Sequence, residues 1–96
     1  MIETITKHYY LSGTVHGVWF RDFVVREAKA RKLNGWVRNL SDGRVEVMVQ
    51  GEPSMLNELE AQLHIGPPLA TVEKVENEIV TEPTDIYFDF KQIETL

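Results

Sequence analysis

The sequence predicts an α+β domain in which one mainly antiparallel sheet of four or five strands carries two helices on a single face. Two segments with apolar residues at helical spacing alternate with five β-prone segments, in the order strand, helix, strand, strand, helix, strand, strand. The middle strands are joined by Ser41-Asp42-Gly43, a sequence typical of a tight hairpin turn. This order indicates a split β-α-β sandwich of the ferredoxin-like kind, and 96 residues suit one domain over residues 1–96.

The first strand is expected over residues 4–15, where Ile5, Tyr9 and Leu11 share one parity that Lys7 interrupts. A helix should begin at Phe20, because apolar residues then recur at helical intervals as Phe20, Phe23, Val24 and Ala28. Asn34-Gly35 is expected to end this helix, since glycine accepts the left-handed conformation at a helix C-terminus.

Residues 36–40 and 45–49 read as the two hairpin strands. The second helix should open at Glu52-Pro53-Ser54, with Leu56, Leu59 and Leu63 as its apolar stripe, and end at Gly66-Pro67-Pro68. Residues 72–80 and 86–93 are expected to form two further strands, separated by a connection over residues 81–85.

The composition limits the classes of function. A net charge of −5 opposes a general nucleic-acid binder, which usually carries a basic face. The chain has no cysteine and no long apolar run, so we expect a cytoplasmic protein with no membrane partner, no disulfide and no thiolate chemistry. In so acidic a chain an anionic ligand must be attracted locally, by a specific arginine and backbone N–H groups.

The loop that leads into the first helix is the best candidate for such a site. It runs Gly13-Thr14-Val15-His16-Gly17-Val18-Trp19-Phe20-Arg21. The first N–H groups of a helix have no internal partners, and together with the helix dipole they favour an anion. The nucleotide-binding patterns Gly-x-x-x-x-Gly-Lys-Ser/Thr and Gly-x-Gly-x-x-Gly are both absent.

Arg21 stands in the first turn of this helix, where the dipole disfavours a cation. Two interpretations remain open from this feature alone. Arg21 is either a solvated side chain paired with an acid such as Asp22, or it offers its planar fork of donors to phosphate oxygens.

A second segment carries Asn39 near the end of a strand, where asparagine is a poor strand former. Taken alone, Asn39 is best explained as a turn cap. Trp19 and Trp36 are expected to be packing residues, with Trp36 in the core or at its edge.

Together the two segments closely resemble the two signatures of the acylphosphatase family. The first signature ends in Val15-His16-Gly17-Val18-Trp19-Phe20-Arg21, and the second reads Gly35-Trp36-Val37-Arg38-Asn39, followed by Gly43-Arg44-Val45. One departure is visible, because the family usually has glutamine where this chain has His16. We interpret His16 as a loop-supporting residue rather than a catalytic base.

The resemblance implies hydrolysis of the carboxyl-phosphate bond of small acyl phosphates by direct attack of water. It assigns the phosphate cradle to the loop residues, Arg21 to phosphate binding and transition-state stabilisation, and Asn39 to holding the attacking water. The cradle would comprise Val15, His16, Gly17, Val18, Trp19 and Phe20. No metal or cofactor is implied, inorganic phosphate should be product and competitive inhibitor, and a monomer is expected.

Two other classes of function are compatible with the same fold. A non-catalytic phosphate-binding or regulatory module of the same fold has no need for both Arg21 and Asn39 at these spacings. An RNA-recognition domain would use aromatic residues on the sheet, such as Tyr10 and Tyr87, but it would also need a basic surface.

Overall fold

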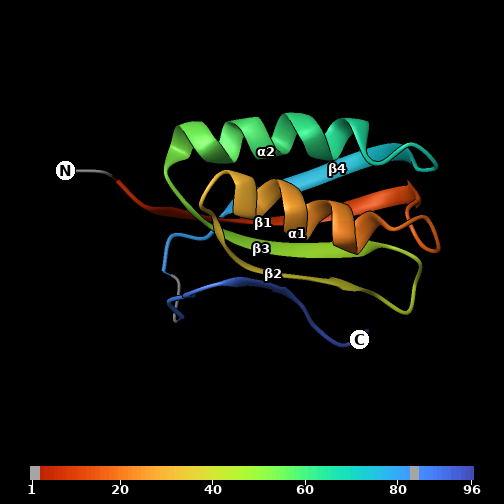
Figure 1. The fold of residues 1–96 in the computed structure, drawn as a ribbon. Coiled ribbons are helices and arrows are strands. Elements are labelled where there is room, and N and C mark those ends of the chain that lie inside the picture. Colours follow the sequence, from red (N-terminus) through yellow and green to blue (C-terminus); the bar gives the residue numbers. More distant parts are fainter. Residues whose placement is uncertain (1–2, 83–84) are drawn as a thin grey trace.

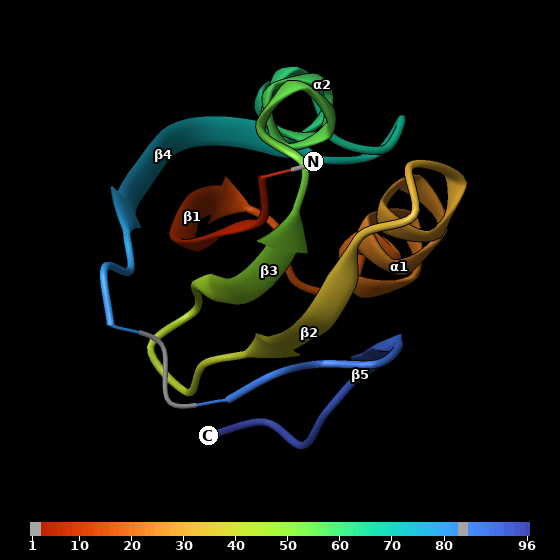
Figure 2. The ribbon, with the colours of Figure 1, turned by 90° about the vertical axis from the view of Figure 1, so that its left-hand side faces the viewer.

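The computed structural model describes residues 3–82 and 85–96, and within them the elements follow the predicted order. They are β1 (Ile5–Thr14), α1 (Phe20–Ala30), β2 (Asn34–Asn39), β3 (Val45–Gly51), α2 (Pro53–Ile65), β4 (Thr71–Ile79) and β5 (Phe90–Gln92). The elements form two layers, with both helices on the same side of the sheet (Figures 1 and 2). Neither helix is long and apolar enough to span a membrane in the described part of the chain.

The sheet has the order β4-β1-β3-β2-β5. Its antiparallel pairs are β1 with β3, β1 with β4, and β2 with β3, whereas β5 runs parallel to β2. The split β-α-β arrangement and the mainly antiparallel sheet predicted from the sequence are therefore confirmed.

The core lies between the sheet and the helices. Alternate residues of the central strands point into it, such as Tyr9 and Leu11 of β1 and Val47 of β3, and all three are fully buried. They pack against the apolar faces of the helices, formed by Phe20, Phe23, Val24 and Ala28 of α1 and by Leu56, Leu59 and Leu63 of α2. Burying these side chains is the main stabilising contribution to the layered fold.

Lys7, which interrupts this apolar parity, is accommodated by a polar group on α2. The ammonium of Lys7 and the hydroxyl of Tyr9 both donate to Oε1 of Glu60, at 3.3 Å and 2.8 Å. Burial alone raises the pKa of Glu60, but these two donors outweigh it and hold that pKa below its usual value.

The first helix ends differently from the sequence prediction. Asn34-Gly35 was expected to end α1, but the helix stops at Ala30, and Lys32 takes the left-handed conformation at φ 58°. The N–H groups of Arg31 and Leu33 then donate to the carbonyl of Ala28. Gly35 lies inside β2, where a Cβ atom would stand 1.9 Å from the carbonyl oxygen of Met48. Glycine is required there by close backbone approach rather than by a helix end.

The last strand is shorter than predicted. Residues 86–93 were expected to form a strand, but only Phe90–Gln92 pairs with β2. Upstream, the carbonyl of Asp89 accepts from the N–H of Gly35 in β2, whereas Tyr87 is held by side chains. Its N–H donates to Gln50 Oε1 and its carbonyl accepts from Asn34 Nδ2, at 3.0 Å and 3.1 Å. Ile86 and Phe88 are left exposed. Pro83 and Thr84 of the expected connection lie outside the described residues.

Candidate active site

The loop between β1 and α1 presents a row of backbone donors. Gly17 (φ 71°) and Trp19 (φ 65°) both take left-handed conformations, and Trp19 is the N-cap of α1. Within the described residues, no backbone N–H of residues 17–22 donates to a carbonyl, and the first that does is that of Phe23, to Trp19. Unpaired N–H groups at the N-terminal end of a helix dipole are an arrangement that favours an anion.

Arg21 projects from the first turn of α1 and is half-buried. Among the described residues it forms no ion pair, so the pairing with Asp22 left open by the sequence does not occur. Asp22 instead accepts a hydrogen bond from Nε2 of Gln92, on β5. The guanidinium of Arg21 therefore keeps its donors available for a ligand.

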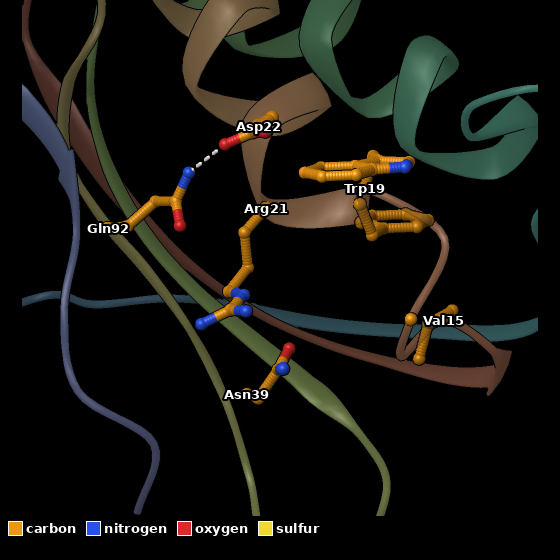
Figure 3. Close-up of a pocket in the computed structure, with 8 residues that line it drawn as sticks. Val15, Trp19, Arg21, Asp22, Asn39 and Gln92 are labelled. Atoms are coloured by element: carbon orange, nitrogen blue, oxygen red, sulfur yellow. Dashed lines mark hydrogen bonds between the residues drawn. The ribbon is translucent and has the colours of Figure 1, made fainter.

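Asn39 is the last residue of β2 and shares the helix-facing side of the sheet with Val37 and Gly35. Its Oδ1 atom is buried, and no described residue donates a hydrogen bond to it. An unpaired buried acceptor is costly in a folded protein and calls for a partner, such as water or a ligand. Figure 3 shows the side chains of Arg21 and Asn39 pointing toward one another from α1 and β2.

These features border one pocket of about 250 Å³. Its lining comprises Val15, Gly17, Trp19, Phe20, Arg21, Asp22, Asn39 and Gln92. The structure thus brings Arg21 and Asn39 together with four of the six loop residues predicted from the sequence. Val18 does not line the pocket, and its buried side chain packs in the hydrophobic core.

His16 also stays out of the pocket. Its ring nitrogen Nε2 lies 2.8 Å from the carbonyl oxygen of Arg44, at the far end of the β2–β3 hairpin. A carbonyl only accepts, so Nε2 carries the proton and donates. The hairpin end is itself ordered, because Arg44 donates from its backbone and side chain to Asp42, and these bonds lower the pKa of that carboxyl. The contact joins the loop to the turn that follows Asn39.

Trp19 corrects an expectation from the sequence. It was predicted to be a packing residue, but 74% of its surface is exposed. The left-handed backbone at Trp19 directs the side chain away from the core and onto the rim of the pocket, as Figure 3 shows. Trp36 is half-buried on the opposite face of the sheet, where its indole N–H donates to the hydroxyl of Tyr87 at 3.3 Å.

Gln92 was missed by reasoning from the sequence. It follows the second motif by more than fifty residues, and a single glutamine near the end of a strand carries no local signal. Its register opposite Val37 puts it on the helix-facing side of the sheet, as Phe90 is. From there it reaches Asp22 and closes one side of the pocket.

Chemically, the pocket combines anion donors with a free acceptor. The loop N–H groups and Arg21 suit phosphate oxygens, and Oδ1 of Asn39 suits a hydroxyl hydrogen such as that of water. The residues that the structure describes contain no group of three or more His, Asp or Glu side chains placed to hold a metal ion.

Comparison with known proteins agrees with this geometry. The family model described as Acylphosphatase matches residues 7–92. An acylphosphatase of Chlorobaculum tepidum is 52% identical over 68 residues, which cover 71% of this chain and 74% of that protein.

Solved structures give the same result. An acylphosphatase from Coxiella burnetii superposes with a TM-score of 0.88 at 38% identity, covering 94% of this chain and 93% of that one. An acylphosphatase from Bacillus subtilis also has a TM-score of 0.88, at 31% identity, covering 93% of this chain and 98% of that one. The chain belongs to the acylphosphatase family.

Proposed function

We propose that this protein is an acylphosphatase that hydrolyses the carboxyl-phosphate bond of small acyl phosphates, giving a carboxylate and inorganic phosphate. Family membership supports the activity. The observation that carries the mechanism is the shared pocket of Arg21, which has no ion pair among the described residues, and Asn39, whose Oδ1 has no donor there. One side chain is free to hold the phosphate, and the other is free to hold the second reactant.

In the proposed ground state, the loop N–H groups and the guanidinium of Arg21 bind the three phosphate oxygens. Phosphoryl transfer requires mainly positioning and charge stabilisation, and these donors supply both. The planar guanidinium of Arg21 donates two hydrogen bonds to the phosphate oxygens as negative charge develops on them, and a single ammonium group cannot reproduce this bidentate geometry.

Asn39 acts on the attacking water. Its Oδ1 accepts one hydrogen of the water, which directs an oxygen lone pair at phosphorus. The water oxygen then bonds to phosphorus while the bond from phosphorus to the carboxyl oxygen breaks. The carboxylate leaves with the electron pair, and a phosphate oxygen takes the proton of the water. A carboxylate is a good leaving group, so no further acid is required.

Inorganic phosphate should compete with the substrate, because it makes the same contacts to the loop and Arg21. Arg21→Ala should therefore lose phosphate inhibition and reduce turnover of acetyl phosphate by about 10³–10⁵-fold. Arg21→Lys should also be poor, since it keeps the charge but not the bidentate geometry. Steady-state hydrolysis with a chelator present measures both, and an active Arg21→Ala variant would overturn the assignment.

Asn39→Ala separates the two roles. It should reduce kcat by on the order of 10²-fold, the scale of a misplaced reactant, while the inhibition constant for phosphate stays close to that of the parent protein. Equal losses in kcat and phosphate affinity would show that Asn39 does not act on the water. Phosphate binding without any turnover by the parent protein would favour a non-catalytic binding module.

A further inference from the structure

Trp19 has a position that phosphate binding alone does not explain. A large indole is 74% exposed at the rim of the pocket, on a residue held at φ 65°. A left-handed conformation is unfavourable for a bulky residue, and exposing an indole forfeits the burial that tryptophan normally obtains. The backbone donors of the loop do not require any particular side chain at this position.

The geometry of in-line displacement suggests a role for the side chain of Trp19. In an in-line displacement, the water and the leaving group lie on opposite sides of phosphorus. Asn39 marks the water side in the proposed function. In Figure 3 the indole of Trp19 lies above the guanidinium of Arg21 and the amide of Asn39 lies below it, and all three residues line one pocket. With phosphate held at Arg21 and water at Asn39, as in the proposed function, the acyl group would leave on the side of Trp19.

We propose that Trp19 forms an acyl-group subsite that selects acyl phosphates with a flat, aromatic acyl group. This inference rests on the proposed function and names the substrate class of the same site. The exposed indole offers an apolar face against which an aromatic ring stacks, and stacking releases water from both surfaces. A methyl group, as in acetyl phosphate, is too small to cover that face.

Substitution of Trp19 tests the subsite without touching the phosphate donors. Trp19→Ala and Trp19→Phe both keep a Cβ atom, so neither relieves the backbone conformation at this position. Trp19→Ala should raise KM for benzoyl phosphate by roughly 3- to 10-fold, the range of a single aromatic pair. KM for acetyl phosphate should rise much less than KM for benzoyl phosphate, and Trp19→Phe should recover most of the lost affinity.

Phe88→Ala is the matched control, because Phe88 is an exposed aromatic residue that does not line the pocket. It should leave both substrates unaffected. Equal effects of Trp19→Ala on benzoyl and acetyl phosphate would overturn the subsite. If the parent protein hydrolyses neither compound, the proposed function fails instead, and a binding measurement then decides the subsite separately.

That measurement uses indole fluorescence. Trp36→Phe leaves Trp19 as the sole indole of the chain. Benzoylphosphonate, which cannot be hydrolysed at its carbon-phosphorus bond, should quench this fluorescence and shift its maximum, whereas acetylphosphonate should do so much less. Identical responses to the two phosphonates, or none to benzoylphosphonate at saturation, would refute stacking on Trp19.

Discussion

Replacing Gln92 with alanine should weaken phosphate binding, because it releases Asp22 from its present hydrogen bond. Asp22 adjoins Arg21 in the first turn of α1, and both line the pocket. In the structure Nε2 of Gln92 holds the Asp22 carboxylate. Without that amide, Asp22 is free to pair with the guanidinium of Arg21 and to repel an anion in the pocket.

The size of the effect follows from exposure. Asp22 and Gln92 are both exposed, so the new pair is a surface ion pair, which contributes about 0.2–1 kcal/mol. A tenfold change in affinity corresponds to about 1.4 kcal/mol, so the inhibition constant for phosphate should rise by up to about fivefold. KM for acetyl phosphate should rise in parallel, and kcat should not change, since Asn39 is untouched.

The assay is competitive inhibition of acetyl phosphate hydrolysis by inorganic phosphate, at low and at high ionic strength. Salt should reduce the difference between Gln92→Ala and the parent protein, because exposed charges are screened. Asp22→Asn in the Gln92→Ala background should restore the parent inhibition constant. A double variant as weak as Gln92→Ala would refute the reasoning and place the defect in the packing of β5.

Three further predictions concern stability and the loop. Glu46→Gln should lower the free energy of unfolding by about 1.5–3 kcal/mol at neutral pH. Burial alone raises the pKa of Glu46, but hydrogen bonds from Arg38 and His8 outweigh it and hold that pKa low. The stabilisation is therefore present above the pKa of the unfolded chain and is lost as pH falls through the lowered pKa of the folded protein. Urea unfolding at pH 7 and pH 3 should show the difference between variant and parent shrinking, and a constant difference would contradict the assignment. Gly35→Ala should lower the free energy of unfolding by at least about 2 kcal/mol, because the residue has a positive φ and its new Cβ would meet the carbonyl of Met48. Gly43→Ala has open space around it and should lose only the free energy of holding alanine at a positive φ. Thermal melts that rank the two variants equally would be inconsistent with this. His16→Gln should retain activity, because an amide also donates to the carbonyl of Arg44. His16→Ala should raise the inhibition constant for phosphate by up to about tenfold, the scale of one hydrogen bond. Inhibition assays check both variants, and equal behaviour of the two would show that the contact has no role.

The sequence predicted the architecture well because its signals are periodic and local. Alternation of Val45, Val47 and Val49 marks a strand with one buried face, and the leucines of α2 mark a helix with one apolar stripe. Both patterns follow from backbone geometry, so they can be recognised without knowing which elements pack together. The motifs also predicted that Arg21 and Asn39 would meet in one pocket with the loop, although His16 and Val18 do not line it.

The features that the sequence did not predict depend on tertiary contacts or on local conformation. Tyr87 satisfies its backbone groups through the side chains of Gln50 and Asn34 rather than through a strand, and a pattern of β-prone residues cannot reveal that. The Asp22–Gln92 bond joins residues from opposite ends of the chain, so no spacing rule reaches it. Trp19 is exposed because its φ is positive, which residue type alone argues against.

The position of β1 between β3 and β4 also sets the order in which this chain acquires structure. β1 is the first strand, yet its pairing with β4 joins Thr14 to Thr71 and Lys7 to Ile79. Such distant pairings are slow to form because a long loop must close first, so this chain should fold more slowly than one whose contacts are mostly local. During synthesis, the loop and Arg21 emerge well before the strand that completes the sheet beside β1. The proposed anion-binding half of the site is thus synthesised early, but the strand pairing beside it is complete only when Ile79 has left the ribosome.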